Sequence, residues 1–73
     1  METETRLTGP QIRAARGLLG ISQPALATAS DLTRQTVSTL ENRDVSPPGS
    51  GGRIASAFLR LGVQFSSNGV RLV

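Results

Sequence analysis

The sequence contains no cysteine and no histidine. The absence of cysteine excludes disulfide bonds and thiolate chemistry, and the absence of both residue types removes most zinc sites and the usual general base at neutral pH. Three carboxylates lie outside the N-terminal tail, and they form no closely spaced pair on one predicted element: Asp31, Glu41 and Asp44. No nucleophile has a suitable base. We therefore expect neither an enzyme nor a protein that requires a metal or another cofactor.

Long apolar segments are also missing. No run approaches the ~20 residues that a transmembrane helix needs, and the N-terminus lacks the basic-then-apolar pattern of a signal peptide. We therefore expect a soluble, cytoplasmic protein that does not contact membranes. A chain of 73 residues has room for one domain near the lower limit of what a single core stabilises, so support from a second subunit is expected.

Lysine is absent, and all eight basic residues are arginines, against five acids. Glu2 and Glu4 lie in the first four residues, so the rest of the chain is more basic than the net charge of +3 indicates. This balance favours an anionic partner, because the planar guanidinium group forms paired hydrogen bonds with phosphates and guanine edges. Codon bias in the source is an alternative explanation for the missing lysine.

Capping signals predict three helices in the first part of the chain. Thr8 with Gln11 forms a capping box, which predicts a helix that ends within residues 17–20. Ser22 is the predicted cap of a second helix over residues 23–30, and Thr33 is the predicted cap of a third. Only Asp31 and its neighbours separate these two helices, so the turn must be tight and the helices must cross steeply.

Asp31 itself is expected to adopt a left-handed backbone conformation, which aspartate tolerates better than most residues. Its side chain is expected to be tied to nearby backbone amides.

The second part of the chain changes in character. Residues 42–52 are rich in proline, glycine and serine and predict a flexible loop. The Gly-Ser-Gly-Gly stretch in it has neither the preceding strand nor the following Lys-Ser/Thr of a phosphate-binding loop. Apolar residues at helical spacing, Ile54, Phe58 and Leu61, predict a fourth helix over residues 51–61 that stops at Gly62.

A two-residue period at the C-terminus predicts a β-hairpin with an Asn-Gly turn between two short strands. The apolar residues of its strands are Val63, Phe65, Val70 and Leu72. Because an isolated hairpin is marginally stable in water, this apolar face must pack on the helices or pair with another chain. We expect these four residues to form a dimer interface. If they are instead buried within one subunit, dimerisation on DNA alone is the alternative.

The predicted third helix has two contrasting faces. At 100° per residue, Val37 and Leu40 point towards the core. The opposite face is small and polar, and it carries Arg34, Gln35, Ser38, Thr39 and Asn42. Such groups match base edges and phosphates, whereas an ordinary solvated face more often carries Glu and Lys. An ordinary polar surface is the alternative interpretation.

The segment SQPALATASDLTRQTVSTLEN, residues 22–42, resembles the helix-turn-helix of the Cro/cI-type, or XRE, family of phage and bacterial regulators. The specific matches are Gln23 at the start of the first motif helix, Ala27 at its tight packing position, Val37 inside the second helix, and Leu40-Glu41-Asn42 at its end. With the flanking segments, the resemblance extends from Leu7 onward.

The resemblance implies a role for each position of the motif. It places five side chains against base edges in the major groove: Thr33, Arg34, Gln35, Ser38 and Thr39. Gln23 is implied to bind a phosphate and to brace the start of this recognition helix, while Asn42 and Arg43 are implied to hold backbone phosphates. Arg16 is implied to pair with Glu41 as structural support.

The expected fold is mainly α: four short helices with a central helix-turn-helix, plus a short C-terminal β-hairpin. Residues 1–6 are expected to form a flexible tail, residues 7–62 the helix-turn-helix DNA-binding domain, and residues 63–73 the hairpin and dimerisation element. Glycine at positions 51 and 52 departs from the apolar residues usual at the start of the family's fourth helix.

The resemblance implies a sequence-specific transcriptional regulator of double-stranded DNA, most simply a homodimeric, autoregulatory repressor that binds an inverted repeat. Activation through polymerase contact is an alternative within this class. A helix-turn-helix module that binds a regulatory protein, such as an antitoxin or anti-activator, is the alternative from another class.

Overall fold

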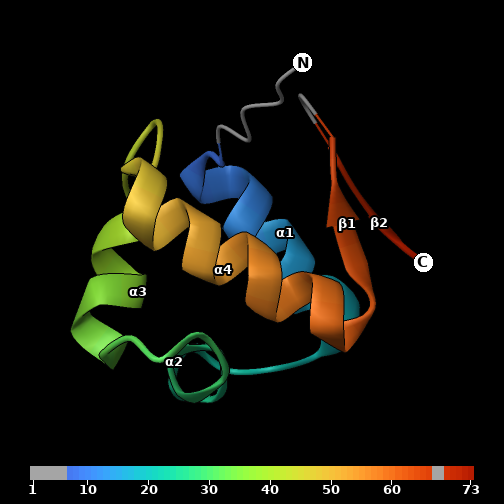
Figure 1. The fold of residues 1–73 in the computed structure, drawn as a ribbon, viewed down its shortest axis with the longest axis horizontal. Coiled ribbons are helices and arrows are strands. Elements are labelled where there is room, and N and C mark those ends of the chain that lie inside the picture. Colours follow the sequence, from blue (N-terminus) through green and yellow to red (C-terminus); the bar gives the residue numbers. More distant parts are fainter. Residues whose placement is uncertain (1–6, 67–68) are drawn as a thin grey trace.

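The structure, a computed structural model, describes residues 7–66 and 69–73. Within these residues the chain forms four helices and two strands (Figure 1): α1 (Gly9–Leu19), α2 (Gln23–Ser30), α3 (Arg34–Glu41), α4 (Pro48–Leu61), β1 (Val63–Phe65) and β2 (Val70–Leu72). The expected mainly α fold with a C-terminal hairpin is confirmed. The predicted tail, residues 1–6, and Asn68 of the predicted Asn-Gly turn lie outside the described residues.

The first three helices begin directly after their predicted caps. The Thr8 hydroxyl accepts a hydrogen bond from the Gln11 amide at 3.2 Å, and the Gln11 side-chain oxygen accepts one from the Thr8 amide at 3.0 Å. The hydroxyls of Ser22 and Thr33 cap α2 and α3 in the same way. Each cap satisfies an amide that has no acceptor inside its helix, so local chemistry sets these boundaries.

Helix α4 begins earlier than predicted, at Pro48. The expected loop over residues 42–52 is therefore wrong in its second half. Proline favours the first turn of a helix because its φ angle is already helical and its missing amide needs no partner there. Gly51 is buried inside this first part of α4, and a Cβ at Gly51 would lie 3.2 Å from the Ser46 Cβ. The glycine thus serves close packing inside a helix.

The hydrophobic core draws on all four helices and β1. Its buried members are Leu7, Ile12, Ala15, Leu26, Ala27, Val37, Leu40, Ile54, Phe58 and Val63. The Phe58 ring is fully buried and meets the half-buried Phe65 ring edge to face, with 5.5 Å between centroids. This packing joins α4 to the hairpin, and aromatic pairs of this geometry add to the stabilisation from burial alone.

The hairpin is tied to the helices by its apolar face. Its antiparallel register pairs Val63 with Leu72 and Phe65 with Val70. Val63 is fully buried in the core of its own chain, so the prediction that it contributes to a dimer interface is wrong. Phe65 and Val70 are half-buried against the same core, whereas Leu72 is 57% exposed.

A buried side chain of α1 also anchors the hairpin. The Gln11 amide nitrogen donates to the backbone oxygens of Ser66 at 2.9 Å and Gly69 at 3.1 Å. Gln11 therefore caps its own helix through its side-chain oxygen and anchors the hairpin through its side-chain nitrogen.

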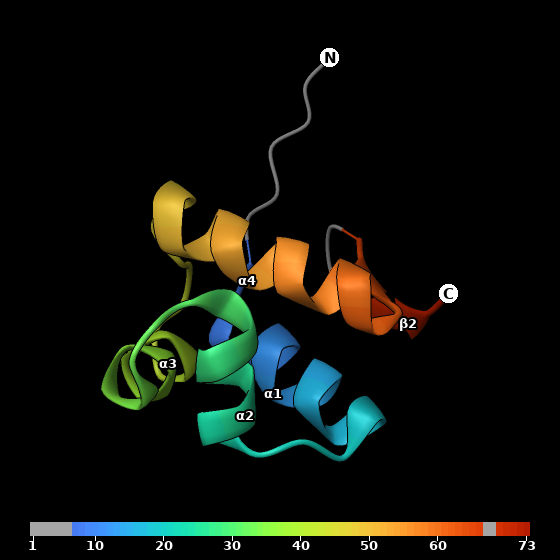
Figure 2. The ribbon, with the colours of Figure 1, turned by 60° about the horizontal axis from the view of Figure 1, so that its bottom comes forward.

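The arrangement separates α3 from the hairpin. Figure 1 shows α3 near the N-terminal end of α4 and the two strands at its C-terminal end. Figure 2 shows α2 and α3 together on one side of α4, with α1 beside α2. The molecule measures 32 × 24 × 18 Å along its principal axes. None of the helices in residues 7–66 is both long and apolar enough to span a membrane.

Candidate nucleic-acid interface

The turn between α2 and α3 is formed by a left-handed residue. Asp31 has φ 59° and ψ 42°, as expected from its position, and its amide donates back to the end of α2. The prediction that its side chain bonds backbone amides is wrong. The Asp31 side chain is 97% exposed, and its Oδ2 lies 3.5 Å from Arg53 Nη1. The backbone conformation alone therefore reverses the chain, because the reversal needs a positive φ angle and not the carboxylate.

Helix α3 presents the two faces that its sequence predicts. Val37 and Leu40 are buried in the core. The outer surface carries the candidate base-contacting residues, of which four are exposed and Ser38 is half-buried: Thr33, Arg34, Gln35, Ser38 and Thr39. Within residues 7–66 and 69–73, the side chains of Arg34, Gln35 and Thr39 make no hydrogen bond. Their donors and acceptors therefore remain available to a partner.

Thr33 differs from its neighbours because its hydroxyl is already used. It accepts from the Thr36 amide at 3.1 Å and donates to the Thr36 hydroxyl at 2.8 Å. Thr33 therefore holds the start of α3 in place, and its methyl group and one acceptor lone pair remain for contact with a partner.

A hollow of about 350 Å³ lies between the outer side of α3 and the start of α4. Its lining consists of Thr33, Gln35, Thr36, Thr39, Leu40, Arg43, Pro47 and Ser50. Arg43 is exposed here, on the connection between the two helices. Thr36 and Ser50 were not among the predicted site residues. Ser50 lines the hollow because residues 47–50 border it, which the sequence does not show.

The candidate phosphate-contacting residues differ in their surroundings. The Asn42 side-chain nitrogen donates to the Ser38 backbone oxygen at 3.0 Å, so this amide is turned back onto its own helix. The Gln23 nitrogen donates to Glu41 Oε1 at 3.0 Å. Gln23 was expected to brace the start of α3, but this hydrogen bond reaches the last residue of that helix. Arg43 alone of the three makes no side-chain hydrogen bond within the described residues.

Glu41 is the meeting point of α1, α2 and α3. Its side chain is 3% exposed, and Arg16 approaches both carboxylate oxygens, with Nε 2.5 Å from Oε2 and Nη2 3.0 Å from Oε1. Arg13 donates a hydrogen bond to the Glu41 backbone oxygen. Burial raises the pKa of the Glu41 carboxyl, but the hydrogen bonds from Arg16 and Gln23 outweigh this effect and hold the pKa below its ordinary value. The expected structural ion pair is thus present, with partners that the sequence did not indicate.

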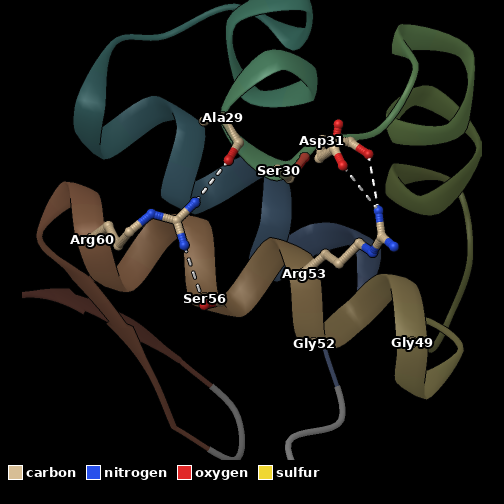
Figure 3. A pocket seen from close by; sticks show the side chains of 8 residues that line it. All are labelled: Ala29, Ser30, Asp31, Gly49, Gly52, Arg53, Ser56 and Arg60. Carbon is tan, nitrogen blue, oxygen red and sulfur yellow. Dashed lines mark hydrogen bonds and ion pairs between the residues drawn. The ribbon is translucent and has the colours of Figure 1, made fainter.

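Two arginines of α4 hold the end of α2 (Figure 3). Arg60 donates to the Ala29 backbone oxygen at 2.9 Å, and Arg53 donates to the Asp31 backbone oxygen at 3.1 Å. They border an open cleft of about 520 Å³ between α2 and α4. Helix α2 has no basic residue in its own last turn, so α4 supplies the positive charge that a helix C-terminus favours. These two hydrogen bonds were not predicted from the sequence, because they join elements that are far apart in the chain.

A short helix, a tight turn and a second helix with an exposed, polar, arginine-bearing face define a helix-turn-helix DNA-binding protein. Residues 12–50, more than half of the chain, match the helix-turn-helix family model. The chain belongs to this family, of the Cro/cI or XRE type, whose members are DNA-binding regulators. Comparisons with curated proteins and with solved structures gave no match.

Proposed function

We propose that this protein is a sequence-specific transcriptional regulator that acts in the cytoplasm. It acts as a homodimer, binds an inverted repeat through the major groove and represses transcription from its own operator. The observation that carries the proposal is the outer surface of α3, where Arg34 and Gln35 are exposed and make no side-chain hydrogen bond within the described residues. Placing α3 in the groove gives these polar groups partners of matching chemistry.

The two longest side chains of this surface suit different bases. Arg34 can donate two parallel hydrogen bonds to guanine, and Gln35 can pair with the edge of adenine. Each such pair discriminates against the wrong base by about 1–3 kcal/mol. Thr39 and the methyl group of Thr33 suit shorter contacts, including the methyl group of thymine.

Backbone contacts would set the register of the protein on DNA. Arg43 is exposed beside α3 and has the charge and reach to bind a phosphate. Gln23 and Asn42 have neutral amides, each with a second N–H beyond the one already donated within the protein. These contacts add affinity without selecting sequence.

Exposed apolar side chains near the C-terminus support the homodimer. They are Leu59, Leu61, Leu72 and Val73, with exposed fractions of 43–71%. Burying them against a second copy would supply the apolar contact that a small domain lacks. A two-fold dimer would place its two α3 helices in successive major grooves, about 34–36 Å apart.

The test begins by selecting duplexes from a randomised library with the wild-type protein, in the presence of nonspecific competitor. Fluorescence anisotropy then measures the affinity of Arg34→Ala and Gln35→Ala for the selected duplex and for its single-base variants, over a salt series. Each substitution is expected to remove the preference at one base pair per half-site, weakening binding to the selected duplex by roughly tenfold or more.

Arg71→Ala is the matched control, because Arg71 is an exposed arginine on β2, at the other end of α4 from α3. It loses the same charge and should keep the base preference. Selection that recovers no consensus, or binding that is indifferent to Arg34 and Gln35, would contradict the proposal and favour a protein partner.

A further inference from the structure

The cleft between α2 and α4, called here the α2–α4 cleft, takes no part in the proposed contacts with DNA (Figure 3). Its volume is about 520 Å³, and its walls are the end of α2 with the turn that follows it and one face of α4. None of the candidate DNA-contacting residues lines it. A partner can therefore occupy the cleft without displacing a predicted contact with DNA.

Two arginines give the α2–α4 cleft its positive charge. Arg53 donates through Nη1 to the Asp31 backbone oxygen. Arg60 donates through Nη2 to the Ala29 backbone oxygen and through Nη1 to the Ser56 hydroxyl. Within the described residues, Nε and Nη2 of Arg53 and Nε of Arg60 have no hydrogen-bond partner. The hydrogen bonds to α2 thus fix both guanidinium groups in place and leave donors of each for a partner.

Two glycines of α4 keep the α2–α4 cleft open. Gly49 and Gly52 line it, and a Cβ on either would meet nothing within 4 Å. Neither has the positive φ angle that favours glycine, and glycine weakens a helix relative to alanine. Close packing therefore explains Gly51 but not these two glycines. A chain segment that lies across them would need the space that they leave.

The charges of the lining select the kind of occupant. Two guanidinium groups favour an anion, because they form paired hydrogen bonds with carboxylates and phosphates. The exposed Asp31 carboxylate, whose Oδ2 lies 3.5 Å from Arg53 Nη1, would repel the continuous phosphates of a nucleic acid. It can accept hydrogen bonds from the amides of a peptide. Pockets for small molecules are enclosed and mostly apolar, whereas this cleft is open and polar.

We propose that the α2–α4 cleft binds an acidic segment of a partner protein in an extended conformation. Arg53 and Arg60 lie two turns of α4 apart, about 10 Å along the helix. Acidic residues two to four positions apart in an extended chain span about 7–13 Å, so two carboxylates of one segment can reach both arginines. The inference goes beyond the proposed function and does not depend on it, because it uses no contact with DNA.

The probe is a displayed library of short random peptides, selected on the wild-type protein without DNA. The enriched peptides are expected to carry two acidic residues at this spacing and to bind more weakly as the salt concentration rises. Fluorescence anisotropy with one enriched peptide then compares the wild type with Gly52→Glu. This variant places a carboxylate in the cleft and removes neither arginine, and it should weaken binding about tenfold or more.

Gly17→Glu is the matched control. Gly17 is an exposed glycine of α1, and a Cβ there also meets nothing within 4 Å. The control adds the same charge outside the cleft and should bind the peptide almost as the wild type does.

Exchanges in both partners test the two arginines. Arg53→Gln and Arg60→Gln should each weaken binding of the enriched peptide. A peptide with one acid replaced by glutamine should lose affinity for the wild type, but not for the variant that lacks the matching arginine.

A measurement on the wild-type protein covers the case in which these arginine variants do not fold. In isotope-labelled protein, the Nε–H signals of Arg53 and Arg60 should shift when the enriched peptide is added. The signal of Arg71, an exposed arginine on β2, should not.

Three results would overturn the inference. The library yields no acidic consensus, or Gly52→Glu and Gly17→Glu bind the enriched peptide equally. In the third, a single-stranded oligonucleotide binds more tightly than the peptide and is weakened by Gly52→Glu, which would assign the cleft to nucleic acid. None of these results affects the proposed function, which fails separately if the wild-type protein selects no duplex.

Discussion

Among the glycines of the described residues, Gly9 leaves the least room for a side chain. A Cβ at this position would lie 2.1 Å from the Glu41 backbone oxygen and 2.8 Å from that of Arg43. Both are backbone atoms, so no side-chain rotation relieves the clash. We expect Gly9→Ala to lower the free energy of unfolding by about 3 kcal/mol, measured by urea denaturation.

Gly17 provides the control in the same helix, because a Cβ there would meet nothing within 4 Å. Gly17→Ala should raise the free energy of unfolding by about 0.5–1 kcal/mol, since alanine has the higher helix propensity. Equal losses in the two variants would show that close contact is not what selects glycine at position 9.

The buried carboxyl of Glu41 predicts a dependence of stability on pH. Its pKa in the folded protein is below its ordinary value, so the unfolded chain binds the proton more readily. The resulting stabilisation is present above the unfolded pKa, about 4.3, and is lost as the pH falls through the lower folded pKa. Unfolding free energies measured from pH 7 downward should therefore fall more steeply below that value in the wild type than in Glu41→Gln. Parallel curves would contradict a lowered pKa.

At the scale of elements, the turn between α2 and α3 depends on a backbone conformation and not on a charge. Asp31 combines a positive φ angle with an almost fully exposed side chain. Asp31→Ala should cost about 1 kcal/mol, because alanine lacks the short polar side chain with which aspartate and asparagine tolerate this conformation. Asp31→Asn should change the stability by less than about 0.5 kcal/mol, because asparagine tolerates the conformation and the exposed ion pair with Arg53 contributes little. Thermal unfolding of both variants measures these changes in stability. If Asp31→Asn lost as much stability as Asp31→Ala, the loss would be due to the carboxylate and not to the backbone conformation.

The boundaries of the helices show what local sequence determines. Thr8, Ser22 and Thr33 each satisfy an amide three residues further on, so the starts of α1, α2 and α3 could be predicted. The start of α4 could not. Pro48 suits the first turn of a helix, but Gly49, Gly51 and Gly52 are typical of loops, and the packing of Gly51 against Ser46 is a long-range contact that the sequence does not show.

The candidate site also has a part that local sequence predicts and a part that depends on tertiary packing. The exposed face of α3 follows from helical periodicity, because Val37 and Leu40 fix which side is buried. The hydrogen bond from Gln23 to Glu41 depends on how α2 crosses α3, which no local pattern encodes. The hydrogen bonds from Arg53 and Arg60 to the C-terminal end of α2 also join residues far apart in the sequence, so no local pattern predicts them.

At the scale of the whole molecule, the proposed homodimer predicts which surface joins two copies. Val63 is buried in the core of its own chain, so the proposed homodimer is expected to use apolar groups that remain exposed near the C-terminus. Leu59 on α4 and Leu72 on β2 are each 57% exposed. Removing them should therefore weaken self-association without disturbing the fold.

Leu59→Ser/Leu72→Ser is expected to raise the dimer dissociation constant at least tenfold in sedimentation equilibrium, because two apolar side chains lose a burial worth about 1.5 kcal/mol or more each. Its melting temperature should stay close to that of Leu18→Ser, a control at a leucine of α1 that is 46% exposed. On a duplex with two half-sites, the double variant should keep its affinity for a single half-site and lose cooperativity, because each α3 still contacts bases but the subunits no longer meet. If cooperativity and sedimentation are both unchanged, the two copies must join through another surface.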